Sequence, residues 1–115
     1  MSLAGEDFCY ITTTGRVTGH PHKIEIWFGM NGSTIYMLAG GGLRSDWPQN
    51  IARHPQVQVR IGDREFEGRG RIVDDPQEDA LARRLLPEKY QAGYGEDLSE
   101  WAREALPVAI DLEPA

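Results

Sequence analysis

Hydrophobic and polar residues alternate along several short stretches of the chain, which is the pattern of half-buried β-strands. The clearest case is QVQVRI at 56–61, where every second residue is aliphatic. Six segments have strand character by alternation or by β-branched and aromatic content: 8–14, 23–28, 34–38, 56–61, 65–73 and 107–112. Asn31-Gly32 is a two-residue hairpin signal between the second and third of these strands, and glycines within 65–73 suggest bulges or a tight bend.

Three segments have helical character instead. The first begins at Ser45 or Asp46 and ends near His54, and the last covers 97–105. The middle helix opens at Asp74-Asp75-Pro76 and is expected to end near Leu86, because Pro87 follows. Six strands and about three short helices predict an α+β fold with a mostly antiparallel sheet, which can avoid exposed edges by curling into a small barrel.

The length of 115 residues predicts a single domain, 1–115, in which residues 1–6 are expected to be disordered or a cloning remnant. No apolar run is long enough to span a bilayer, and the single Cys9, expected to be a small buried hydrophobe, has no internal disulfide partner. Both features favour a cytoplasmic protein without an integral membrane segment. The oligomeric state is left open, with a homodimer as one possibility.

Charge is distributed unevenly along the chain, whose net charge is -6. Residues 1–73 carry eight basic and seven acidic side chains, whereas 74–115 carry four basic and eleven acidic ones. An acidic protein is a poor binder of nucleic acid, because affinity there depends on neutralising phosphates. An anionic small ligand is therefore expected to bind a local basic cluster in the first half.

Such a cluster occurs in the turn after the first strand, which contains Arg16, His20, His22 and Lys23. Fixed charge and hydrogen-bond donors close together are what anion recognition requires. Composition alone favours the alternative, a solvated hairpin tip without a ligand.

A second candidate is the glycine run Gly40-Gly41-Gly42, which leads into a helix start. Exposed backbone amides at such a place bind phosphates and other oxyanions, although three glycines can equally mark a flexible loop. The run matches neither the Walker pattern nor the dinucleotide fingerprint. Beyond it, Trp47 is expected in the core, and Asn50 to brace the loop.

Tyr90 and Tyr94 lie in a glycine-flanked segment that could close over a pocket, where a phenol can stack on a ring or donate a proton. Anchoring of the loop to the barrel is the alternative. The three histidines have no metal-ligand spacing, so no metal site is expected. Without a Ser/His or Cys/His pair at informative spacing, an enzyme with this sequence needs a cofactor for its chemistry.

Several segments together resemble the deazaflavin (F420)-dependent nitroreductase and F420H2-dependent quinone reductase family. They are TTTGRVTGHPH (12–22), YMLAGGGLRSDWPQNI (36–51), ARHPQVQVRI (52–61) and ALPVAIDLEP (105–114). The resemblance covers nearly the whole chain, in order. It implies a split β-barrel of the FMN-binding type that binds F420, a deazaflavin with a phosphate and an oligoglutamate tail.

The resemblance also implies roles for individual residues. The basic hairpin would hold the phosphate and tail, the segment after the third strand would hold the linker and ring, and the Tyr90/Tyr94 segment would lie on the substrate side. The implied cofactor-binding residues are Arg16, His20, His22, Lys23, Ala39, Gly41, Arg44, Ser45, Trp47 and Asn50. The implied activity is hydride transfer from reduced F420 to a quinone, enone or nitro compound.

Two alternatives share the barrel. Val17 stands where many relatives have Lys or Arg, which slightly favours an FMN-binding reductase, because one phosphate needs fewer cations. The other alternative is a barrel that binds a small hydrophobic or anionic ligand, or a tetrapyrrole, without turnover.

Overall fold

The computed structural model describes residues 3–113. Its seven strands form one sheet in the order β2-β1-β5-β6-β7-β4-β3, and every neighbouring pair is antiparallel. The strands are β1 (Cys9–Thr14), β2 (Pro21–Ile26), β3 (Gly29–Asn31), β4 (Thr34–Ala39), β5 (Gln56–Ile61), β6 (Arg64–Ile72) and β7 (Leu106–Leu112). The α+β class and the antiparallel sheet are confirmed, with one strand more than expected.

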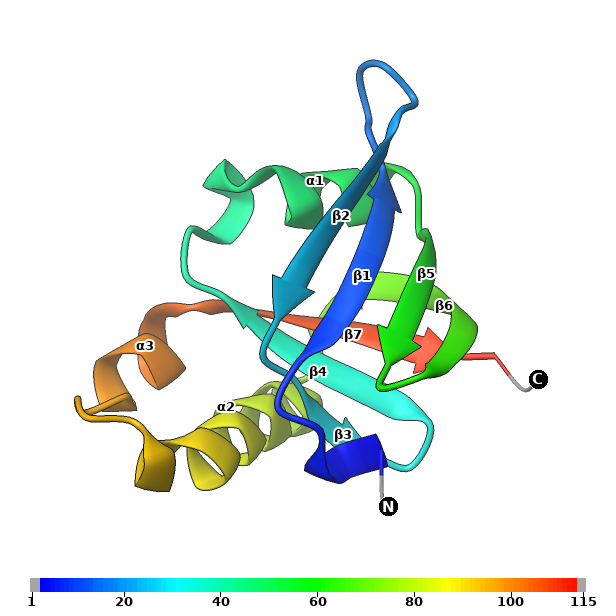
Figure 1. Cartoon of the computed structure of the whole chain (residues 1–115). Coiled ribbons are helices and arrows are strands. Elements are labelled where there is room, and N and C mark those ends of the chain that lie inside the picture. Colours follow the sequence, from blue (N-terminus) through cyan, green and yellow to red (C-terminus); the bar gives the residue numbers. More distant parts are fainter. Residues whose placement is uncertain (1–2, 114–115) are drawn as a thin grey trace.

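The extra strand arises because the expected strand 23–28 is divided. β2 ends at Ile26 and pairs with β1, whereas β3 begins at Gly29 and pairs with β4, at the other edge of the sheet. Only Trp27 and Phe28 join these two edges. Three chain steps reach at most about 11 Å, so the sheet must curl until its edges nearly meet. The result is a barrel that is split between β2 and β3 (Figure 1).

Two details of the strands differ from the sequence expectations. The hairpin loop between β3 and β4 consists of Gly32 and Ser33, because Asn31 pairs with Thr34, and Gly32 takes the positive φ of 62°. β6 keeps an unbroken register with both neighbours, so its glycines make no bulge. They make room instead: a Cβ on Gly70 would lie 2.7 Å from the Cγ2 atom of Ile51.

Three α-helices cover the ends and the split of the barrel: α1 (Asp46–Arg53), α2 (Pro76–Tyr90) and α3 (Ser99–Glu104). In Figure 1, α1 lies across one end, whereas α2 and α3 lie beside the split. The Asp75 carboxylate caps α2 by accepting from the Glu78 amide at 2.9 Å. α2 continues through Pro87 to Tyr90, so the expected end at Leu86 is wrong. Proline removes one backbone donor, and the packing of Leu85 and Leu86 against the sheet outweighs that loss.

Short 3-10 helices complete the fold: η1 (Leu3–Gly5), η2 (Gly42–Arg44) and η3 (Gln91–Gly93). Within the N-terminal segment expected to be disordered or a cloning remnant, η1 is formed and Leu3 packs against the barrel core; Met1 and Ser2 lie outside the described residues. No helix within residues 3–113 has the length and apolar character needed to cross a membrane.

Two apolar clusters make the core. The larger fills the barrel, with Ile11, Met37, Val59 and Ile110 among its fully buried members. The smaller lies between the sheet and α2, which is why β4 and β7 are buried on both faces. Cys9 is fully buried in the barrel, and burial raises the pKa of its thiol to about 12, so the expected role as a small hydrophobe fits its position.

Candidate functional site

The hairpin loop between β1 and β2 is fixed to the middle of α1 through Asn50, whose side chain braces this loop and not the glycine run as expected. The Asn50 side chain is buried, its Oδ1 atom accepts from the Arg16 backbone amide at 3.1 Å and from the Arg16 guanidinium at 3.0 Å, and its amide nitrogen donates to the Thr13 hydroxyl at 3.2 Å. The guanidinium also contacts the Asp46 carboxylate at 3.3 Å. Arg16 is thus a positioned cation, whose side chain keeps 30% of its surface exposed.

Replacement of Asn50 by leucine is expected to lower the free energy of unfolding by about 2 kcal/mol, because the Arg16 amide and the Thr13 hydroxyl each lose a buried partner. Urea denaturation measures the change. Gln49→Ala on the same helix removes an exposed bond to the Leu43 carbonyl and is the matched control, with an expected effect below about 0.5 kcal/mol. Equal effects of the two variants would contradict the assigned role of Asn50.

His22 and Lys23, the other basic residues at the start of β2, lie on two different faces of the sheet. His22 pairs with Thr13 across the β1–β2 ladder, so its side chain lies on the Asn50 side, where a Cβ on Gly15 would come within 2.8 Å of its ring. Lys23 pairs with Thr12 and lies on the outer face, with its ammonium 5.3 Å from the Tyr10 ring centre. The structure therefore brings Arg16 and His22 together and separates Lys23 from them. His20 is exposed at the loop, next to Gly19 with its positive φ of 77°.

The glycine run leads from the end of β4 to η2 and α1. Gly41 lies against the Ser45 hydroxyl so closely that no Cβ fits between them, and Arg44 returns to the Gly41 carbonyl through its backbone amide at 3.1 Å and its Nε atom at 3.4 Å. The Arg44 side chain is exposed there. Asp46 follows and contacts Arg16. Ala39 and Trp47, the other implied cofactor contacts, are packed into or against the core.

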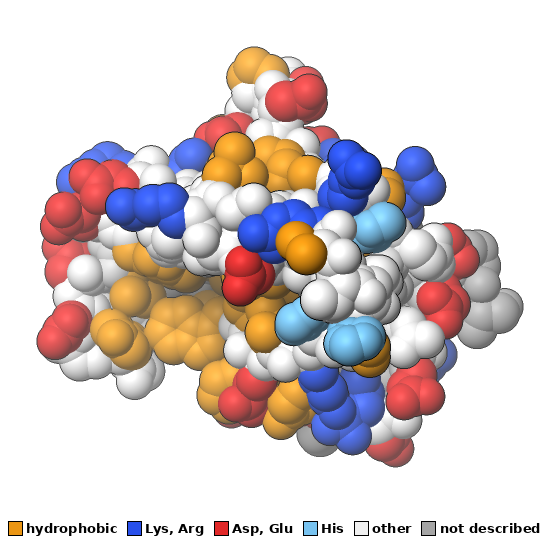
Figure 2. All heavy atoms as spheres, turned by 90° about the horizontal axis from the view of Figure 1, so that it is seen from above, with side chains coloured by type: hydrophobic (Ala, Val, Ile, Leu, Met, Phe, Trp, Pro, Cys, Tyr) orange, Lys and Arg blue, Asp and Glu red, His pale blue; other side chains and the backbone are white. Residues whose placement is uncertain are grey.

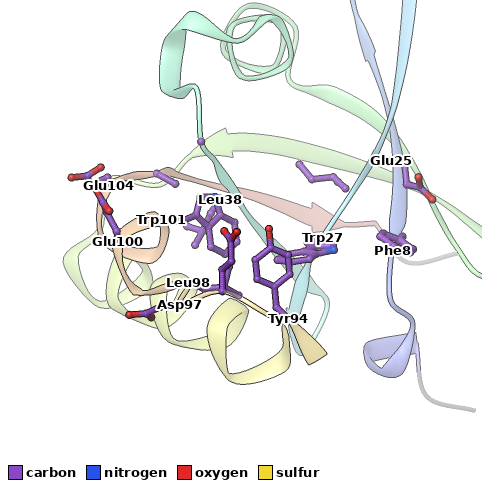
Figure 3. Close-up of a pocket in the computed structure, with 14 residues that line it drawn as sticks. Phe8, Glu25, Trp27, Leu38, Tyr94, Asp97, Leu98, Glu100, Trp101 and Glu104 are labelled. Carbon is purple, nitrogen blue, oxygen red and sulfur yellow. The ribbon is translucent and has the colours of Figure 1, made fainter. Parts of the chain in front are cut away.

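An aromatic cleft of about 700 Å³ opens at the split, and Gly40 is part of its wall. Trp27 forms the centre of that wall: it stacks on Tyr90 with ring centres 4.3 Å apart, and meets Tyr94 and Trp101 edge-on at 5.4 and 5.8 Å. The lining residues come from Phe8 just before β1, the end of β2, the split, the end of β4 and the 94–105 segment (Figure 3). This volume is within the usual range for small-molecule and cofactor sites.

The two tyrosines differ in position. The Tyr90 hydroxyl accepts from the Phe28 amide at 3.0 Å and lies 2.8 Å from the Asp7 carbonyl, and burial raises the pKa of this phenol to about 12. Tyr90 therefore ties the N-terminal segment to the split and is not among the residues that line the cleft. Tyr94 lines the cleft and is 44% exposed.

Residues that the sequence interpretation missed lie in the 96–104 segment. Trp101 forms one wall of the cleft, and Glu96, Asp97, Glu100 and Glu104 also line it. Glutamates at 100 and 104 are four residues apart, which places them on one face of a helix. That spacing beside a tryptophan is the signal that could have indicated this wall.

Figure 2 shows the two halves of the site from above: blue and pale-blue side chains gather over the hairpin and α1, and an apolar recess with acidic side chains at its edge lies to their left. A series of neighbouring residues links the cleft to Arg16. Gly40 lines the cleft, and the next residue, Gly41, packs against Ser45. Asp46 follows Ser45 and contacts Arg16. A phosphate and carboxylates fit the cationic end, which has donors with exposed surface. A flat ring fits the aromatic end.

Comparisons with known proteins agree with this geometry. The family model described as F420H(2)-dependent quinone reductase matches residues 1–113. An F420-H2 dependent reductase structure aligns with a TM-score of 0.72 at 22% identity, over 93% of this chain and 94% of that chain. A putative pyridoxamine 5'-phosphate oxidase from Listeria innocua aligns with a TM-score of 0.72 at 20% identity, over 97% and 88%. The heme storage protein HutZ from Vibrio cholerae aligns with a TM-score of 0.70 at 14% identity, over 96% and 84%. At these identities the structural matches establish the split-barrel fold alone.

Proposed function

Because this chain belongs to the F420H(2)-dependent quinone reductase family and its cofactor is coenzyme F420, we propose that it reduces a small electron-poor acceptor, a quinone, an enone or a nitro compound. Bound F420 in its reduced form supplies the hydride. The observation that carries the proposal is the continuity of a positioned cation, Arg16, with an aromatic cleft through the glycine run.

In this proposal the chain's own residues orient the two reactants and exclude water. Arg16, His22 and Arg44 hold the phosphate and carboxylates at the hairpin end, helped by the bare backbone at Gly41. Lys23 lies on the outer face, away from these side chains. Trp27 and Trp101 provide flat surfaces against which a ring and an acceptor stack.

A titration against F420, FMN and FAD tests the cofactor assignment. F420 is expected to bind most tightly, because it offers several anionic groups to the cations at the hairpin. Turnover is then followed as oxidation of reduced F420 on addition of each acceptor class. A purified protein that carries FMN, with a flavin absorption band, would establish the FMN alternative instead, and absence of F420 binding would remove the proposal.

The Tyr94 hydroxyl is the proposed proton donor to the reduced acceptor. It lines the cleft, and no hydrogen bond ties it to another side chain within residues 3–113, whereas the Tyr90 hydroxyl is engaged by backbone groups. Replacement of Tyr94 by phenylalanine is expected to lower kcat by about tenfold to a hundredfold, at the lower end of general-acid effects, with F420 affinity unchanged. Steady-state kinetics measure both. Tyr90→Phe, expected to leave kcat unchanged, is the matched control; the reverse pattern would assign the proton to Tyr90.

A further inference from the structure

The aromatic cleft carries a charge opposite to the rest of the site. Five acidic residues line it, Glu25, Glu96, Asp97, Glu100 and Glu104, and its described lining residues include no Lys, Arg or His. None of these five carboxylates is in an ion pair within residues 3–113, and Glu25 accepts from the Tyr10 hydroxyl at 2.9 Å. The cleft is therefore a cavity with apolar aromatic walls and a negative rim.

Arg83 and Lys89 are engaged elsewhere, whereas Arg103, on α3, acts electrostatically on Asp97. Arg83 donates to the Asp79 carboxylate at 2.6 Å and to three backbone carbonyls of the α3 region at 2.8–2.9 Å. Lys89 donates to the Phe28 carbonyl at 2.9 Å, with its ammonium 3.7 Å from the Phe28 ring centre. The Ser99 amide donates to Asp97 and lowers the pKa of that carboxyl, so it is charged at neutral pH. With five acidic side chains and Arg103 as the cation that acts on Asp97, the rim keeps a net negative charge.

The walls add a second attraction for positive charge. The ring faces and edges of Trp27, Tyr94 and Trp101 meet at the cleft. An electron-rich aromatic face attracts a cation that lies within about 6 Å of its centre, and most strongly for tryptophan. Aromatic walls and a carboxylate rim together are the combination that recognises cationic aromatic molecules.

We propose that the cleft at the barrel split selects acceptors that are flat and positively charged, and disfavours anionic ones. The inference rests on the proposed function in one respect, that the acceptor enters this cleft. If F420 binds as proposed, the rim at 96–104 would repel its polyanionic end, and Arg16 and Arg44 would attract that end.

Binding of three small benzene derivatives to the cofactor-free protein tests the selectivity directly. The probes are benzyltrimethylammonium, neutral benzamide and benzenesulfonate, followed by quenching of tryptophan fluorescence, since Trp27 and Trp101 line the cleft. The cation is expected to bind about tenfold or more tightly than the anion, with benzamide between them. The preference should shrink in 0.5 M salt, because exposed charges are screened. Equal affinities, or no binding of any probe, would overturn the inference.

A pair of double variants assigns the selectivity to the rim. Glu100→Gln with Glu104→Gln is expected to reduce the preference for the cation about fivefold, since two unit charges near the ligand are removed. Glu65→Gln with Glu67→Gln removes the same charge from the exposed side of β6 and should leave the preference unchanged. Equal effects of both double variants would show that the preference depends on the net charge of the protein and not on the carboxylates at the cleft.

Failure of the proposed function remains distinguishable. Cation preference without F420-dependent turnover would remove the function and keep the binding selectivity. Turnover with equal kcat/KM for a quaternary-ammonium quinone and a sulfonated quinone would keep the function and remove the selectivity.

Discussion

Replacement of Arg16 by glutamine is expected to weaken F420 binding by about tenfold to a hundredfold. A charged donor to a phosphate or carboxylate is worth about 1.5–3 kcal/mol when its partner is held in place. Arg16 meets that condition, because Asn50 and Asp46 fix its guanidinium while part of it stays exposed. Fluorescence or calorimetric titration of F420 measures the change. The fold should persist, since the Arg16 backbone amide still donates to Asn50.

Lys23→Gln is the matched control, because it removes one positive charge from the same hairpin. Its ammonium lies on the outer face of the sheet beside Tyr10, away from Arg16 and His22. We expect a change of less than about twofold at physiological salt, where exposed charges are strongly screened. If both variants weaken F420 binding equally, the hairpin contributes only its net charge, and the assigned role of Arg16 as a positioned contact is wrong.

The sequence interpretation did not predict that Lys23 and His22 lie on opposite faces of the sheet. Both residues were assigned to one basic cluster because they are adjacent in the chain. β2 begins at Pro21, so the two side chains belong to a strand and point to opposite faces. The alternation of Thr12, Thr13 and Ile24 indicates that neighbouring residues point to opposite faces of the sheet. It applies to His22 and Lys23 only if the turn is known to end before Pro21.

The clear alternation at 56–61 predicted β5 to the residue, because one face of this strand is buried in the barrel and the other is exposed. The division between β2 and β3 was not predictable in the same way. Trp27 and Phe28 continue the aromatic and aliphatic run, and no pattern in one strand indicates that its second half pairs with a different neighbour. The split, and with it the aromatic cleft, depends on tertiary pairing.

The same distinction applies to the candidate site: residue types indicate one part of it, and tertiary contacts determine the other. The basic hairpin and glycine run can be identified from residue types; Gly41 packs against Ser45, and Arg16 contacts the following residue, Asp46. The acidic wall at 96–104 was counted as part of an acidic half of the chain and not as part of the site. Net charge over a long segment carries no information on which face a helix presents, whereas the contacts of Trp101 with Trp27 do.

Replacement of Tyr90 by alanine is expected to lower the free energy of unfolding by about 3 kcal/mol, in the range of large-to-small aromatic substitutions. The ring stacks on Trp27 with an interplanar angle of 4° and closes the smaller core cluster beside α2. Its loss leaves one face of Trp27 without a partner at the point where the barrel is split. Urea denaturation followed by far-UV circular dichroism measures the change.

Tyr90→Phe separates the hydroxyl from the ring. This variant keeps the stacking but leaves the Phe28 amide without its acceptor, for an expected loss of about 1–2 kcal/mol. Because the Phe28 amide belongs to the two-residue link between β2 and β3, the Tyr90 hydroxyl stabilises the connection on which the cleft depends. A Tyr90→Phe protein with unchanged stability and reduced turnover would show that this hydroxyl acts on the acceptor, and Tyr94 would lose its assigned role.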